Sequence, residues 1–113
     1  MASDFERVLG LVRQLRDDRE WAQFHNPKDL AASIAIEAGE LLETFQWSGA
    51  DLERMSRRAE STAELADVLI YCLYMADALA VDPLAIIEDK LKADEVKYPV
   101  ERFRGVAGGH VDR

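Results

Sequence analysis

The segment from Ser61 to about Ala80 most constrains the fold, because as a helix it is apolar on nearly every side. Its length favours a helix, since β-strands of about 18 residues are rare. A helix that is apolar all round must be covered by neighbours on all sides. One short chain offers too few other helices to do this. The segment therefore predicts an all-α, four-helix bundle-like domain that assembles into an oligomer.

Helix-start signals place the other helices. Ser3 with Glu6 predicts a capping box. The pairs Asn26-Pro27 and Asp82-Pro83 each combine an N-cap side chain with a proline at the first helical position. The predicted helices cover residues 4–20, 27–47, 61–80 (opening at a capping box of Ser61 and Glu64) and 83–98. We expect one domain over residues 1–113, a short surface helix at most within 50–60, and a partly flexible tail over 100–113.

Charge and composition narrow the class of protein. The formal net charge of −8 and the sequence pI near 4.7 argue against binding of a nucleic acid polymer, which needs a basic surface. The single cysteine, Cys72, cannot form an internal disulfide, so no oxidising compartment is required. The N-terminus lacks the apolar run of a signal peptide, and a bilayer span needs about 20 apolar residues. We therefore expect a cytoplasmic protein that does not bind membranes.

Two pairs of acidic residues indicate a metal site. Glu37 and Glu40 are neighbours on one helical face, and Glu37 falls within an apolar stripe. Glu64 and Asp67 share a face with Tyr71 on the next helix. No lysine or arginine lies on these faces within one turn, and burying an uncompensated carboxylate costs several kcal/mol. A hard divalent cation, Mg²⁺ or Mn²⁺, is the simplest compensation for four oxygen ligands.

Other chemistry is less consistent with the sequence. Taken singly, each acid has a structural alternative, such as helix capping for Glu64 or solvent exposure for Glu40. A di-iron bundle would need Glu-x-x-His pairs, and neither His25 nor His110 supplies one. Zinc would have only one cysteine and two scattered histidines. The four acids together favour the magnesium-type site.

The spacing of these acids resembles a known family. Glu37-x-x-Glu40, followed after 23 residues by Glu64-x-x-Asp67, looks like the metal signature of the MazG-like all-α nucleoside triphosphate pyrophosphohydrolases. Residues 18–25, 37–47, 64–71 and 98–105 are most similar to its dCTP pyrophosphatase group. The resemblance covers about residues 5–105. It implies that a nucleoside triphosphate is cut to the monophosphate and pyrophosphate in a homodimer or homotetramer.

The resemblance also implies roles for particular side chains. The metal ligands and catalytic carboxylates would be Glu37, Glu40, Glu64 and Asp67. Trp21, His25 and Trp47 would form the base pocket, and Tyr71 would line the site beside Asp67. The implied phosphate contacts are Lys90, Tyr98, Arg102 and Arg104.

Three departures from the family pattern bear on which nucleotide the protein prefers. Asp94 stands where the family usually has an asparagine that donates to phosphate. Val12 stands where some dCTP-cleaving members have a histidine, and Gly109-His110 replaces a Lys-Tyr pair in the tail. We expect a preference for dCTP or a related or modified nucleotide that is looser than in members with the histidine. A pyrophosphohydrolase with broad base specificity and a non-catalytic acidic helical interaction module remain the alternatives.

Overall fold

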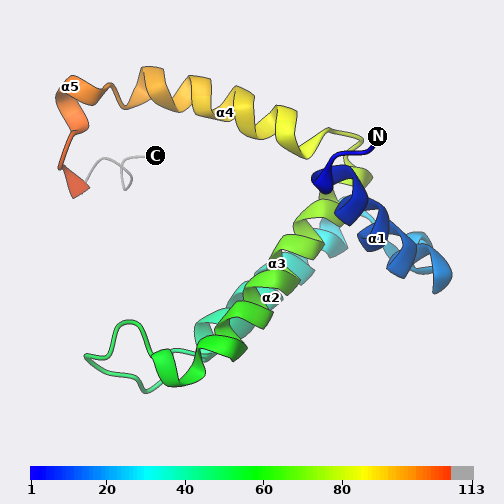
Figure 1. Ribbon diagram of the computed structural model, residues 1–113, viewed down its shortest axis with the longest axis horizontal. Helices are drawn as coiled ribbons and strands as arrows, with labels where there is room; N and C mark the ends of the chain where they lie inside the picture. Colours follow the sequence, from blue (N-terminus) through cyan, green and yellow to red (C-terminus); the bar gives the residue numbers. More distant parts are fainter. Residues whose placement is uncertain (108–113) are drawn as a thin grey trace. The chain divides into compact units, whose positions relative to one another are not determined.

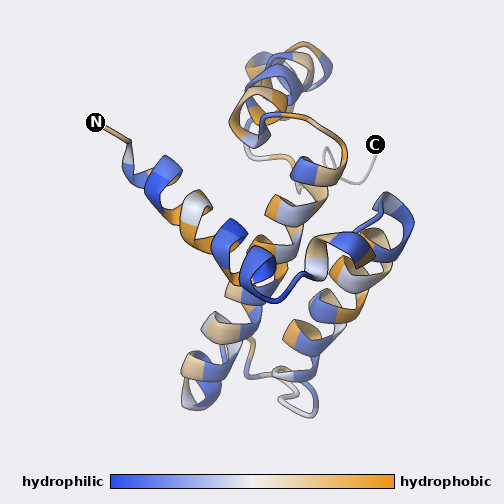
Figure 2. Cartoon of the chain, turned by 90° about the vertical axis from the view of Figure 1, so that its right-hand side faces the viewer, coloured by the Kyte–Doolittle hydropathy of each residue, from blue (hydrophilic) through white to orange (hydrophobic). Residues whose placement is uncertain are grey.

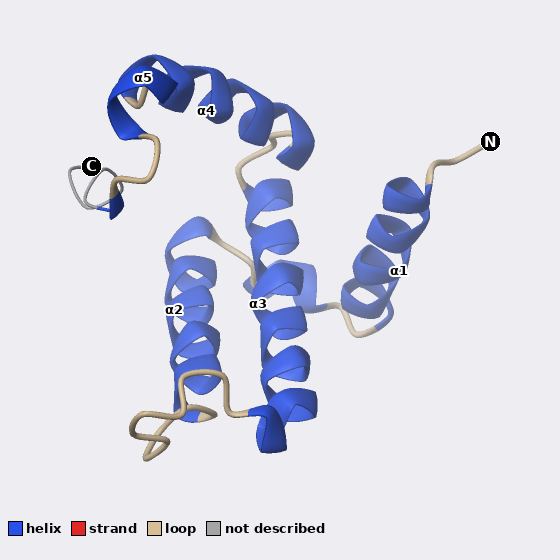
Figure 3. Ribbon diagram, turned by 60° about the vertical axis from the view of Figure 1, so that its left-hand side comes forward, coloured by secondary structure: helices blue, strands red, loops and turns tan. Residues whose placement is uncertain are grey.

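The computed structural model describes residues 1–107 and consists of helices joined by turns, without a strand in that range (Figure 1, Figure 3). The all-α fold class is therefore confirmed. The elements, in chain order, are α1 (Asp4–Asp18), η1 (Trp21–Phe24), α2 (Pro27–Glu43), η2 (Met55–Arg57), α3 (Arg58–Ala78), α4 (Pro83–Lys97) and α5 (Val100–Phe103), where η marks a 3₁₀ turn.

Three of the helix starts agree with the cap signals. The Ser3 hydroxyl accepts a hydrogen bond from the Glu6 amide at 3.1 Å, and the Glu6 carboxylate accepts one from the Ser3 amide at 3.2 Å. Asn26 caps α2 by accepting from the Asp29 amide at 2.9 Å. Asp82 caps α4 by accepting from the Leu84 amide at 2.9 Å. Each bond satisfies a backbone donor that the first helical turn leaves unpaired.

Three expected boundaries are wrong. Helix α3 begins at Arg58, and Ser61 is not its cap; the Ser61 hydroxyl instead hydrogen-bonds the Thr44 hydroxyl at 2.8 Å. Helix α2 ends at Glu43 rather than near Trp47, whose backbone has a positive φ that no helix continues. The short helix α5 lies in the expected irregular tail, beginning directly after Pro99. The part of the predicted tail over residues 108–113, with Gly109 and His110, lies outside the described residues.

The chain divides into two compact units, Met1–Ala80 and Val81–Arg113. In the first unit, α2 and α3 lie side by side and antiparallel, joined by the loop over residues 44–57, and α1 contacts α3 (Figure 3). In the second unit, the Tyr98 ring packs edge-on against Phe103 at 5.2 Å between centroids. The single domain over 1–113 stays a prediction.

Few apolar side chains are buried. Among the described residues, the buried apolar side chains are Leu9, Leu30, Tyr74 and Ala76. Large apolar side chains are exposed along α3, including Leu65 and Leu69, and Figure 2 shows apolar colour on the outer faces of several helices. No single helix among residues 1–107 is long and apolar enough to cross a membrane; the segments of α3 and α4 meet that test only as a pair, by length and composition.

Candidate active site

Three of the four predicted metal ligands come together across the α2–α3 pair. Glu37 and Glu40 project from α2, and Glu64 projects from the facing turn of α3. One carboxylate oxygen from each of the three lies within 4.8 Å of the other two. This acidic group, as we call Glu37, Glu40 and Glu64, is compact enough for one cation to contact all three residues.

The acidic group is electrostatically uncompensated. One oxygen of Glu37 and one of Glu64 are buried without a hydrogen-bond partner. Burial, followed by the charge of Glu40, raises the pKa of Glu37 above its usual range. The same two causes raise the pKa of Glu64. A close group of carboxylates, two of which have an oxygen without a hydrogen-bond partner, is a donor set that a hard divalent cation would satisfy.

A cavity of about 370 Å³ opens beside the acidic group. Its lining includes Glu40, Glu43 and Glu64 together with Arg57. The Arg57 guanidinium is already engaged by Glu60, to which its Nε donates at 2.8 Å. Four of the seven residues that line the cavity are glutamates, and its arginine is in an ion pair with one of them, Glu60.

Asp67 and Tyr71 continue the same face of α3. Asp67 is exposed and does not join the acidic group, but its charge contributes to the raised pKa of both Glu37 and Glu64. Tyr71 is half-buried, and its ring meets Tyr74 edge-on at 6.1 Å between centroids. At about 1.5 Å of rise per residue, Tyr74 lies about 10 Å along the helix axis from Asp67.

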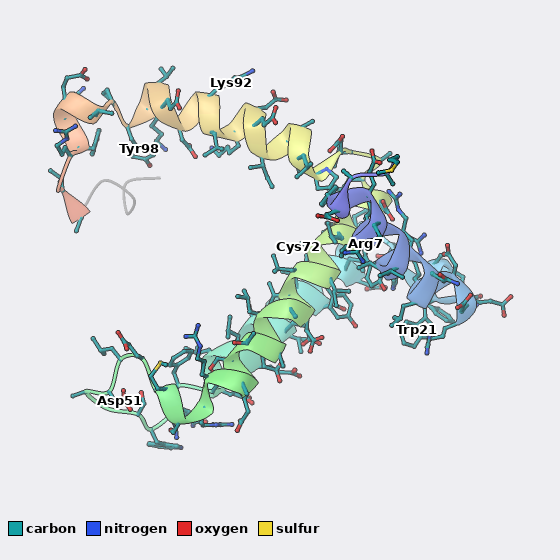
Figure 4. The ribbon with its side chains drawn as sticks, viewed as in Figure 1. Arg7, Trp21, Asp51, Cys72, Lys92 and Tyr98 are labelled. Carbon is teal, nitrogen blue, oxygen red and sulfur yellow. The ribbon has the colours of Figure 1, made fainter. Side chains whose placement is uncertain are left out.

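The segment between α1 and α2 brings His25 onto the end of this face. The His25 ring lies 4.8 Å from the Tyr74 ring, and burial, with a smaller effect of Arg16, lowers the pKa of His25. Its imidazole is therefore neutral near pH 7, and its Nδ1 is buried without a hydrogen-bond partner. Trp21 opens η1, is 43% exposed, and carries the Arg19 guanidinium over its ring at 5.7 Å (Figure 4).

Trp47 follows the end of α2 and is 90% exposed. Its φ of 66° places it in the left-handed region, which is uncommon for a bulky residue and implies that surrounding contacts hold it. Arg54 supplies such contacts by donating from Nη1 to the carbonyl of Thr44, at 3.2 Å, and to that of Gln46. The loop around Trp47 is thus tied to the end of α2.

The remaining predicted residues belong to the second unit. Lys90 and Asp94 form an exposed i,i+4 ion pair at 3.4 Å. Asp94, which stands where the family usually has an asparagine, is therefore paired with a lysine. The Tyr98 hydroxyl is buried without a partner, and Lys97 stands over its ring at 5.4 Å (Figure 4). Arg102 lies in α5 and Arg104 directly follows it. Contact of Lys90, Tyr98, Arg102 and Arg104 with phosphate stays a prediction.

Sequence reasoning missed a second cluster of charged residues. The carboxylate of Asp77, on α3, accepts hydrogen bonds from Arg13 at 2.7 and 3.0 Å and from Arg16 at 2.9 Å, both on α1. The one available signal was an aspartate within the apolar stretch of residues 68–80, because a buried acid requires a partner. The partners are more than 60 residues away in sequence, so spacing could not identify them.

The chain is similar to known proteins in both sequence and fold. Residues 32–108, which include the acidic group, match the MazG-like family. The chain is 36% identical to dCTP pyrophosphatase 1 of Rattus norvegicus over 113 residues, and 35% identical to that of Homo sapiens over 105 residues. These matches cover 95% and 88% of this chain but 66% and 61% of the relatives, so the chain spans up to about two thirds of their length.

A solved structure is also similar. A pyrophosphatase from Archaeoglobus fulgidus superposes with a TM-score of 0.81 at 41% sequence identity, covering 88% of this chain and 95% of that one. The sequence matches and the structural match thus point to related proteins. Glu37, Glu40 and Glu64 lie within the residues that match the family. The chain belongs to the MazG-like family.

Proposed function

We propose that this protein is a Mg²⁺-dependent nucleoside triphosphate pyrophosphohydrolase that cleaves dCTP, or a related or modified nucleotide, to the monophosphate and pyrophosphate. The observation that carries the proposal is the acidic group, in which three carboxylates approach within 4.8 Å and two of them, Glu37 and Glu64, each have a buried oxygen without a hydrogen-bond partner. The names of its relatives, dCTP pyrophosphatase 1 and a pyrophosphatase, support the reaction class. The role in the cell would be to clean or balance the nucleotide pool.

The donor set fits Mg²⁺, with Mn²⁺ as the second choice, because every candidate ligand is a carboxylate oxygen. Glu37, Glu40 and Glu64 would hold the metal, and Asp67 would complete the set from the next turn of α3. Bound Mg²⁺ supplies charge neutralisation for the triphosphate, polarisation of the α-phosphorus and a lower pKa for a bound water. An acidic chain can in this way take an acidic substrate.

The protein groups would divide the remaining work. A carboxylate of the acidic group could position the attacking water or accept its proton. Tyr71 would line the path of the substrate beside Asp67. Lys90, Tyr98, Arg102 and Arg104 would contact the phosphates as donors.

The base would stack on the exposed aromatic groups. Trp21 and Trp47 offer partly or largely exposed rings, but they lie beyond opposite ends of α2, about 25 Å apart along its axis, so one base can meet both only if a second copy of the chain supplies one of them. Stacking accepts every base because each has a π-face. Selectivity must therefore come from hydrogen bonds to the edge of the base. The neutral imidazole of His25 provides one donor and one acceptor. Val12 has no polar side-chain atom, so we expect looser selection of cytosine than in members with histidine there.

A panel of deoxynucleoside and nucleoside triphosphates, incubated with the protein and Mg²⁺, tests the proposal. The expected products are the monophosphate and pyrophosphate, with the highest kcat/KM for dCTP or a modified relative. Equal kcat/KM for dCTP and purine triphosphates would establish the broad-specificity alternative instead. Absence of pyrophosphate from every substrate would favour the non-catalytic interaction module.

A further inference from the structure

We infer that Asp77 is a positioning residue for the base-binding aromatic groups, acting through Arg16 and Tyr74 on His25 and the η1 turn. This inference rests on the proposed function, because it assigns the residue that holds the base subsite in place. Asp77 lies outside the acidic group, 13 residues beyond Glu64 on α3, which is about 20 Å along the helix axis.

The first step is the link between α1 and α3. Asp77 accepts two hydrogen bonds from Arg13 and one from Arg16, so one carboxylate ties two turns of α1 to α3. The Asp77 and Arg16 side chains are only 19% and 15% exposed, which shields this part of the cluster from solvent screening. Leu9 is the buried apolar residue of α1, so this helix has little apolar packing to hold it.

The second step runs from Arg16 to His25. The Arg16 guanidinium lies over the Tyr74 ring at 5.9 Å, and the Tyr74 hydroxyl donates to the Val12 carbonyl at 2.8 Å. Tyr74 is 4% exposed, so its ring has little freedom to move. The His25 ring packs against that same ring at 4.8 Å. The position of His25 is therefore set by a residue that the Asp77 cluster holds in place.

The third step is the space that these groups enclose. Arg13, Arg16, His25, Tyr74 and Asp77 line one open cavity of about 440 Å³, together with Ala22 from η1 and Ala78. Tyr74, Tyr71 and Asp67 follow one another on a single face of α3, which leads from this cavity to the acidic group. A nucleotide lying along that face would place its base at the cavity and its phosphates at the carboxylates.

Substitution of Asp77→Asn tests the inference, with Asp17→Asn as the matched control. Asp17 accepts a hydrogen bond from the same arginine, from Arg16 Nε at 2.8 Å, but it is on α1 and does not link that helix to α3. The structural readout uses a Trp47→Phe background, in which Trp21 is the sole tryptophan. Acrylamide should quench the fluorescence of Trp21 more strongly in the Asp77→Asn variant than in the parent protein. Quenching in the Asp17→Asn variant should equal that of the parent protein.

The kinetic readout separates positioning from chemistry. With the Trp47 ring restored, Asp77→Asn should raise the KM for dCTP about tenfold, equivalent to about 1.4 kcal/mol, and leave kcat within about twofold. Asp17→Asn should change neither value. Unchanged Trp21 quenching with unchanged KM, a fall in kcat alone, or equal effects of both variants would each overturn the inference.

Two further comparisons keep the outcome decisive. If Asp77→Asn fails to fold, Arg13→Gln removes two of the three hydrogen bonds and keeps the one from Arg16, and should raise KM about threefold; an unchanged KM would then overturn the inference. If the wild-type protein releases no pyrophosphate, the proposed function fails, whereas the Trp21 quenching still decides whether Asp77 positions η1.

Discussion

Glu37 combines partial burial with the neighbouring charge of Glu40, and the two raise its pKa. The folded chain therefore binds this proton more tightly than the unfolded chain, whose glutamates titrate near pH 4.3. Without metal, this contribution to folding stability falls as the pH rises through the window above that value. The carboxylates that would bind the cation thus destabilise the metal-free fold at neutral pH.

Replacement of Glu37 by glutamine should remove this penalty. In the presence of EDTA near neutral pH, the melting temperature of Glu37→Gln should exceed that of the wild type by a few degrees. The gain should shrink as the pH approaches about 4, where the wild-type carboxylate is protonated. Thermal melts at the two pH values measure this, and Glu88→Gln, on an exposed residue of α4, serves as the control. A lower melting temperature for Glu37→Gln at neutral pH would contradict the account.

Trp47 has the most exposed ring of the two tryptophans and is predicted to stack on the base. Trp47→Ala should raise KM more than it lowers kcat, because stacking binds the ground state and the transition state alike. The expected loss is about 1–3 kcal/mol. Trp47→Phe retains a ring and should stay close to the wild type. A Trp47→Ala variant with unchanged KM would remove this residue from the base site.

At the scale of elements, the loop over residues 44–57 depends on one arginine. Arg54 donates to the carbonyls of Thr44 and Gln46 at the end of α2. Arg54→Ala should lower the free energy of unfolding by about 1 kcal/mol, since a partly exposed charged donor is lost from two acceptors. Chemical denaturation measures this, with Arg58→Ala at the start of α3 as the control. Equal stability of Arg54→Ala and the wild type would show that the loop holds itself without this residue.

Helix starts that depend on neighbouring residues could be predicted from the sequence. The starts of α1, α2 and α4 follow from cap residues that bond within three positions, so the sequence was sufficient there. The predicted start of α3 was wrong because the Ser61 hydroxyl bonds to the hydroxyl of Thr44, a residue distant in sequence, and does not cap the helix. A serine with a glutamate three residues later has the same pattern whether it caps a helix or bonds to another helix.

The same distinction applies to the candidate site. The spacing of Glu37, Glu40 and Glu64 placed them on facing helices, and the structure brings them within 4.8 Å. The Asp77 cluster could not be predicted, because periodicity does not specify which arginine on α1 meets a given acid on α3. The predicted phosphate contacts of Lys90, Tyr98, Arg102 and Arg104 stay predictions, which came from the resemblance to the family and not from spacing.

At the scale of the whole molecule, the small core is the main feature. Few described apolar residues are buried, whereas Leu65 and Leu69 on α3 and Leu91 and Val96 on α4 are exposed. Exposed apolar surface of this kind is typical of protein–protein interaction sites. We expect a homodimer or homotetramer in which copies cover these faces.

Light scattering at micromolar concentration measures the assembly. The expected mass is two or four times the chain mass of 12.7 kDa. Leu69→Glu, at an exposed position of α3, should weaken the assembly, while the substitution Asp4→Asn on α1 should leave it unchanged. A wild-type protein that scatters as a 12.7 kDa monomer would rule out the oligomer.

The most direct test of the central claim is pyrophosphate release from dCTP as a function of Mg²⁺ concentration, by the wild type and by Glu37→Gln. Wild-type turnover should rise from zero with added Mg²⁺, be abolished by EDTA, and be absent in Glu37→Gln at every Mg²⁺ concentration. Turnover in EDTA, or full activity of Glu37→Gln, would contradict a metal-dependent site built on the acidic group.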